Sequence, residues 1–126
     1  MRPKTLAEVA QLAAAGDSFD RCLANFLDAF YAAPDPKALA DSPLLLAPEL
    51  GETGSVQDAY LAATAEELAR AHRFSPPAWV TDDARKLHQP WFASPLAALR
   101  TVLLLESPAA FRSRNLFISE NALTRA

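Results

Sequence analysis

The residues best suited to holding an anion lie near the C-terminal end of the chain. Arg112 and Arg114 stand two positions apart and are followed by Asn115. A guanidinium presents a planar fork of N–H donors that matches a carboxylate or a phosphate. On a helix the two arginines would point about 200° apart, whereas an extended chain would place them on one side. The alternative interpretation is a basic helix C-terminus with Asn115 as its left-handed stop.

A second candidate combines a titratable ring with two aromatic ones. His88 precedes Trp91 and Phe92, a mixture that is common in small-molecule and peptide pockets. The same residues also fit a structural role, in which the aromatic side chains close the core under a proline-stiffened loop. His72 is distant in the sequence, and neither histidine has a further His or Cys nearby, so we expect no metal site.

Motifs with established chemistry are missing from the sequence. It has no Gly-rich phosphate loop, no Gly-x-Ser-x-Gly elbow and no His-Glu-x-x-His pair. Cys22 lies within an apolar stripe, where a small buried side chain is expected rather than a nucleophile. The pairs Glu66–Glu67 and Asp82–Asp83 are adjacent, so on a helix each pair diverges by about 100°. We therefore assign no catalytic residue and no cofactor, and a non-enzymatic role is favoured.

Composition indicates one folded domain over residues 1–126. Hydrophobic residues make up 51% and charged residues 21%, which excludes a disordered tail. One cysteine excludes a disulfide framework, and the net charge of −3 argues against bulk binding to nucleic acid. The longest apolar run, Val102–Leu105, is far shorter than the roughly 20 residues that cross a bilayer. With no signal-peptide pattern at the start, we expect a cytoplasmic protein without membrane contact.

Prolines and capping residues divide the chain into short helices. Thr5 and Glu8 form a capping box, Gly16 is a natural C-terminal stop, and Pro34 ends the next segment. Ten prolines and three glycines leave little material for β-hairpin turns. The pattern predicts five helices. They run from Thr5 to about 16, from Asp17 or Ser18 to about 33, from Ser55 to about 72, from Ser94–Pro95 to about 106, and from Ser107–Pro108 to about 114. Short helical turns are expected at Asp35–Pro36, from Thr81 or Asp82 to Leu87, and at Ser119–Glu120.

These elements predict an all-α fold, a single compact orthogonal bundle of about five helices with short helical turns. The segment from Leu96 to Glu106 is apolar nearly all round, which is typical of a central buried helix. The loop at 41–54 carries Leu44–Leu46, which we expect to lie against the core, although a role in an interface stays open. Only residues 116–118 could be extended. The expected core is Phe19, Leu23, Phe26, Phe30, Leu68, Leu99, Leu103 and Phe111.

Charge is uneven along the chain. Residues 1–69 carry four basic and eleven acidic side chains, whereas residues 70–126 carry eight basic and four acidic ones. The two parts could simply complement each other when packed together, or the basic end could face an anionic partner. The helices expected at 95–106 and 108–114 could also form a DNA-reading helix-turn-helix. Ala109 and Ala110 argue against this, since a recognition helix places polar side chains there.

Three stretches of the sequence resemble a group of short uncharacterised bacterial proteins. They are residues 26–34 (FLDAFYAAP), residues 90–95 (PWFASP) and residues 106–125. The last of these stretches fits the motif ESPxxFRxRNxFxSxNALxR. Relatives in that group are sometimes encoded beside a nucleotidyltransferase-like protein. The resemblance therefore implies a partner protein and an antitoxin-like role, and it supplies no catalytic residue.

Taken together, the sequence predicts a protein-interaction module whose partner is another protein, and a homo-oligomer stays open. The alternatives are a small-ligand-binding protein or enzyme with a pocket at His88 and Trp91, and a helix-turn-helix regulator. The expected partner surface consists of Arg100, Arg112, Arg114, Asn115, His88 and Trp91.

Overall fold

The fold is built almost wholly from helices, as the sequence predicts. The computed structural model describes residues 2–93 and 97–125. In chain order the helices are α1 (Leu6–Ala14), α2 (Phe19–Ala32), α3 (Lys37–Ala40), α4 (Ala47–Leu50), α5 (Glu52–Ala71), α6 (Ala97–Glu106) and α7 (Ala109–Arg112). Two 3₁₀ turns, η1 (Ala78–Thr81) and η2 (Asp83–Arg85), and two short strands, β1 (Trp91–Phe92) and β2 (Leu116–Phe117), complete the described residues.

The first two helices begin and end where their capping residues predict. The Thr5 hydroxyl oxygen accepts a hydrogen bond from the Glu8 N–H at 3.1 Å, and Ser18 caps α2 through the Arg21 N–H at 3.2 Å. Gly16 has a φ of 103°, so it makes the turn that a side chain would disfavour. The apolar stripes of α1 and α2 are buried against each other, and the predicted boundaries are confirmed.

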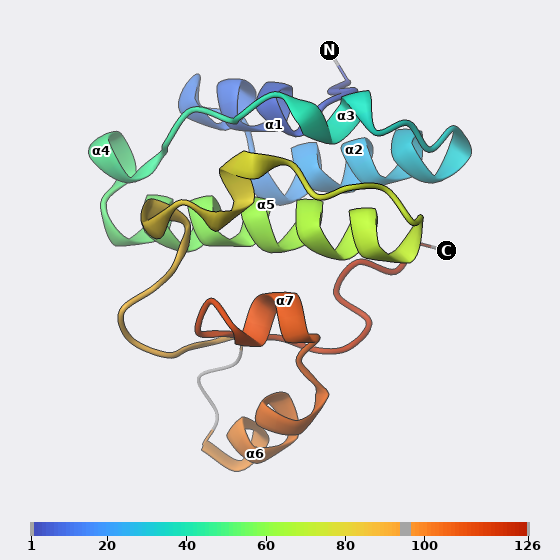
Figure 1. The fold of residues 1–126 in the computed structure, drawn as a ribbon. Coiled ribbons are helices and arrows are strands. Elements are labelled where there is room, and N and C mark those ends of the chain that lie inside the picture. The colour runs from blue at the N-terminus through green and yellow to red at the C-terminus, as the bar shows by residue number, and fades with distance from the viewer. Residues whose placement is uncertain (1, 94–96, 126) are drawn as a thin grey trace.

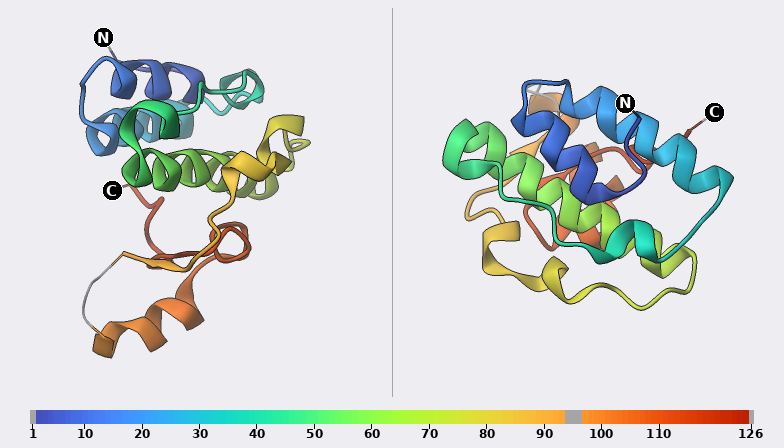
Figure 2. Two further views of the ribbon diagram at one scale, coloured as in Figure 1. Left: turned by 90° about the vertical axis from the view of Figure 1, so that its left-hand side faces the viewer. Right: turned by 90° about the horizontal axis from the view of Figure 1, so that it is seen from above.

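Helix α5 lies between the two parts of the core (Figure 1). On one side it packs with α1 and α2, and Ala62 and Ala65 belong to this larger cluster. On the other side Ala59 and Ala63 pack with Phe111 of α7 and Leu116 of β2. Alanine keeps the helix narrow on both faces, so the neighbouring layers approach it closely. Figure 2 shows the same order of layers from two further directions.

The segment before α5 differs from the prediction. Residues 41–54 include α4, and α5 begins at Glu52 rather than at Ser55. Asp58 is the reason, because its carboxylate accepts hydrogen bonds from the Leu46 N–H at 2.7 Å and the Ala47 N–H at 3.1 Å instead of capping its own helix. An added Cβ at Gly54 would lie 2.4 Å from the Leu46 backbone, so only glycine permits this close approach.

The leucines of that loop divide between core and surface. Leu46 is buried as expected, while Leu44 and Leu45 are exposed. The helical turn predicted up to Leu87 is limited to η2. Strand β1 is a correction, because we expected an extended conformation at 116–118 alone. β1 pairs in parallel with β2, where Trp91 lies opposite Leu116. The extended conformation expected for residues 116–118 is therefore present in β2.

The C-terminal caps also differ in part. Ser107 does not cap α7; its hydroxyl donates a hydrogen bond to the Leu116 carbonyl at 2.9 Å. α7 ends at Arg112, two residues before the predicted end. The chain after Ser119 forms turns and no helix among the described residues. The predicted cap at Ser94–Pro95 lies outside the described residues.

Helix α6 is not the buried central helix that the sequence predicts. It lies at the end of the molecule farthest from α1 (Figures 1 and 2). Leu103 is buried, but Leu99, which we expected in the core, is 42% exposed. The other seven predicted core residues are buried. Among the described residues, no helix combines the length and the apolarity needed to cross a bilayer.

Candidate functional site

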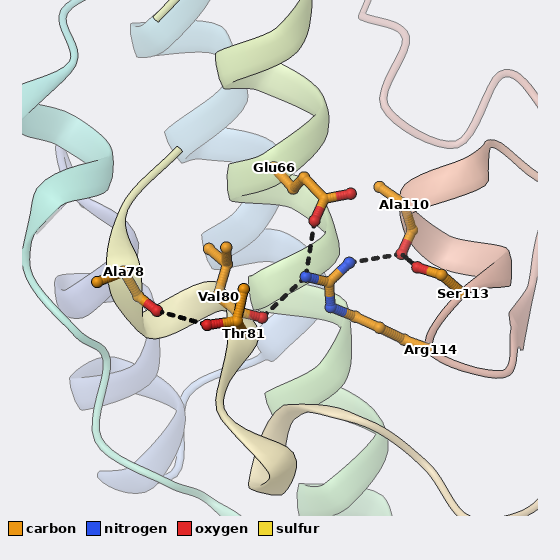
Figure 3. Close-up of polar contacts among 7 residues, drawn as sticks. All are labelled: Glu66, Ala78, Val80, Thr81, Ala110, Ser113 and Arg114. Carbon is orange, nitrogen blue, oxygen red and sulfur yellow. Dashed lines mark hydrogen bonds and ion pairs between the residues drawn. The ribbon is translucent and has the colours of Figure 1, made fainter. Parts of the chain in front are cut away.

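Arg114 joins three elements of the fold and does not face solvent (Figure 3). Its side chain is nearly fully buried and donates to the Ala110 carbonyl at 2.7 Å and to the Val80 carbonyl at 2.8 Å. It also forms an ion pair of 3.0 Å with Glu66 on α5. The guanidinium thus connects α7, η1 and α5. Its assignment to a partner surface is corrected, because its side chain is buried and already bonded to these three groups.

Asn115 has the structural role that the sequence left as an alternative. Its φ of 62° is left-handed, which ends α7 in the way expected of an asparagine stop. Its side-chain amide donates to the Leu87 carbonyl at 2.6 Å, and its own carbonyl accepts from the Trp91 N–H at 2.8 Å. Asn115 therefore holds the 87–91 segment against the C-terminal segment.

The four other predicted surface residues differ in their surroundings. Arg112 and His88 are exposed. The Arg100 guanidinium carbon lies 5.2 Å from the centre of the Phe92 ring, a cation–π contact. Among the described residues, no hydrogen bond or ion pair links Arg100 or Arg112 to His88 or Trp91. The α7 helix that the DNA-reading alternative requires is only four residues long.

Helix α6 carries four large apolar side chains that the described part of the chain leaves partly exposed. Leu99, Val102 and Leu104 are each about two-fifths exposed, and Leu105 is 78% exposed. Leu105 lies about 200° around the helix from the buried Leu103, so it points away from the body. We call these four exposed residues the α6 surface. Apolar side chains gathered in this way mark interaction sites on soluble proteins.

Two hollows meet at Trp91, and both are lined by Glu52 and Val56 of α5. The first hollow has a volume of about 520 Å³ and is lined by residues of α2 and α5 and by Trp91, so we call it the α2–α5 hollow. The second is about 500 Å³ and is lined by the 83–91 segment, including His88. The structure therefore brings His88 and Trp91 to one hollow, as the small-ligand alternative supposes. Sequence reasoning missed the α2–α5 hollow.

Tyr60 lines the α2–α5 hollow and packs edge-on against Phe19 and Phe111. Burial and the nearby Asp20 carboxylate raise the pKa of Tyr60 to about 12.

This pKa predicts a loss of stability in alkali. Below pH 10 Tyr60 is protonated in both states, but between pH 10 and about 12 the unfolded chain ionises first. We expect the free energy of unfolding to fall by about 3 kcal/mol over that interval because of this group. Urea unfolding measured at several pH values checks this. A Tyr60→Phe variant should lose less over the same interval, and an identical loss would contradict the assignment.

Arg85, in the 83–91 segment, forms a buried ion pair with Asp58 of α5. Arg85 is 1% exposed, lies 3.8 Å from an Asp58 carboxylate oxygen and stacks 5.0 Å from the centre of the Trp79 ring. It also donates to the Pro43 carbonyl. Burial raises the pKa of Asp58 and lowers that of Arg85. The pair holds the η2 turn and the 43–47 segment to α5, and the sequence analysis did not single it out.

Groups suited to metal or nucleophilic chemistry are not clustered in the described part of the chain. No three His, Cys, Asp or Glu residues there are close enough to hold a metal ion. Cys22 is buried, and burial raises the pKa of its thiol. His72 packs between aromatic rings, with Phe30 edge-on at 5.0 Å and Phe74 stacked at 5.9 Å. The features left for function are the α6 surface and the two hollows.

Comparison of the chain with protein-family models, with curated proteins and with solved structures finds no significant match to any of the three.

Proposed function

We propose that this chain is a protein-interaction module that binds another protein through the α6 surface. The observation that carries the proposal is the exposure of four large apolar side chains on one ten-residue helix. Covering such side chains removes apolar area from water, which is the main favourable term in protein association. Leu105, the most exposed of them, is the expected anchor.

The shape of this region favours a partner that presents an apolar groove. α6 lies at one end of the molecule (Figure 2), so it offers a convex helix face of the kind that grooves accept. Both hollows of the same chain carry the Glu52 carboxylate in their lining. A hollow that contains a carboxylate is a poor receptor for the uncharged α6 surface, so a second copy of this chain is a poor partner. The first candidate partner is a nucleotidyltransferase-like protein, in accordance with the sequence resemblance.

The test is titration calorimetry with a purified candidate partner. We expect Leu105→Asp to weaken binding at least about 30-fold, since an anchor of this kind contributes about 2 kcal/mol or more. Leu50→Asp is the matched control, because Leu50 is also an exposed leucine but lies on α4. Circular dichroism should show both variants folded, as neither side chain is buried.

Two results would overturn the proposal. Equal loss of binding in Leu105→Asp and Leu50→Asp would show that the α6 surface is not the contact. Sedimentation of the wild-type chain as a dimer that Leu105→Asp dissociates would assign the same surface to self-association instead.

A further inference from the structure

The walls of the α2–α5 hollow are aromatic and aliphatic. Phe19 and Leu23 contribute from α2, Val56 and Tyr60 from α5, and Trp91 from β1. The volume of about 520 Å³ lies within the range of small-molecule sites, about 300–1,000 Å³. A ligand seated here would therefore bury an apolar group against several rings.

The polar groups of the same hollow mostly accept hydrogen bonds and carry negative charge. Asp20 and Glu52 line it, and neither forms an ion pair with any described residue. Gln57 lines it too, and its buried side-chain oxygen has no hydrogen-bond donor in the described structure. Protein atoms cover this oxygen, so the charged acceptors that a ligand in the hollow can reach are the Asp20 and Glu52 carboxylates.

The basic residue in that lining, Arg125, is already paired with a carboxylate that Arg2 also approaches at 3.7 Å. Arg125 forms an ion pair with Asp28, with a nitrogen–oxygen distance of 2.9 Å. That contact lowers the pKa of Asp28 and so holds it ionised. The two carboxylates of Asp20 and Glu52 outnumber the one guanidinium in the lining, so its net charge is negative and attracts cations.

We propose that the α2–α5 hollow binds a small organic cation that carries an apolar group. The ammonium group meets the Asp20 and Glu52 carboxylates, while the apolar group packs among the aromatic walls. Aromatic rings also attract a desolvated cation through their faces. This site is independent of the α6 surface, so Leu105→Asp should leave ligand binding unchanged.

The test uses phenylethylammonium chloride, with phenylethanol as the neutral analogue and phenylpropionate as the anionic one. Binding is followed by NMR through the indole N–H of Trp91, which reports on this wall of the hollow. At matched ionic strength we expect the ammonium compound to shift this signal saturably at millimolar concentrations. It should bind about threefold to tenfold more tightly than the alcohol, because two partly exposed charge pairs form.

Variants distinguish the contribution of the carboxylates from that of the apolar walls. Asp20→Asn combined with Glu52→Gln should remove the preference for the ammonium compound and leave alcohol binding unchanged. Asp41→Asn is the matched control, because Asp41 is exposed and does not line the hollow. Ala24→Phe, which fills the hollow from α2, should abolish binding of both compounds.

Three results would overturn the proposal. They are equal affinity for the alcohol and the ammonium compound, an unchanged Trp91 signal with the ammonium compound, and tighter binding of phenylpropionate. Retention of the ammonium preference in the Asp20→Asn, Glu52→Gln variant would exclude these carboxylates as its cause.

Discussion

Replacing Asp58 with alanine is expected to lower the free energy of unfolding by about 3–5 kcal/mol, enough to unfold much of a marginally stable domain. The change leaves the Arg85 guanidinium buried without its carboxylate. It also removes the acceptor of the Leu46 and Ala47 N–H groups at the start of α4. Urea unfolding followed by circular dichroism measures the loss.

Asp41→Ala provides the control for that measurement. Asp41 is an exposed carboxylate in the same connecting region, and we expect its removal to change the free energy of unfolding by less than about 0.5 kcal/mol. A loss at Asp58 no greater than the loss at Asp41 would show that the buried pair does not hold the 43–47 segment to α5.

The second large effect is expected at Arg114, in contrast to its neighbour Arg112. Arg114→Ala should lower the free energy of unfolding by about 2–4 kcal/mol, because it leaves the buried Val80 carbonyl and Glu66 without their donor. The Ala110 carbonyl also loses one of its two side-chain donors and keeps the Ser113 hydroxyl. Arg112→Ala should change it by less than about 0.5 kcal/mol, since Arg112 is exposed on α7. Thermal and urea unfolding of the two variants side by side check the difference, and similar losses would contradict it.

Local features of the fold could be predicted from the sequence because their causes are local. Thr5 and Ser18 cap the helices that follow them through hydrogen bonds to residues three positions later. Gly16 and Asn115 adopt the left-handed conformations expected of stops. The start of α5 was missed, because the carboxylate that decides it acts on an N–H twelve positions away.

Burial was harder to predict than helicity. The run Val102–Leu105 is apolar on every side. A sequence alone does not show whether such side chains are buried within the chain or exposed at its surface. The residue type of Arg114 likewise indicated an anion site, but its guanidinium is buried among carbonyl groups. Residue type reveals what a group can bind, whereas exposure depends on contacts between distant elements.

The α2–α5 hollow could not be found from spacing at all. Its walls come from α2, α5, β1 and the C-terminal segment, and no short motif contains them. Of the residues that line it, Trp91 alone was predicted as a site residue, on account of its neighbour His88. The structure assigns those two residues to a second hollow that adjoins the first.

The two attachments of the α6 segment have a consequence for how this protein could diversify. The Ala93 N–H donates to the Phe117 carbonyl at 2.9 Å, and the Ser107 hydroxyl donates to the adjacent Leu116 carbonyl at 2.9 Å. The segment that contains α6 is therefore attached to β2 at two adjacent residues. If α6 binds a partner as proposed, a different helix inserted between those two attachments would change the partner while the layers around α5 stay intact.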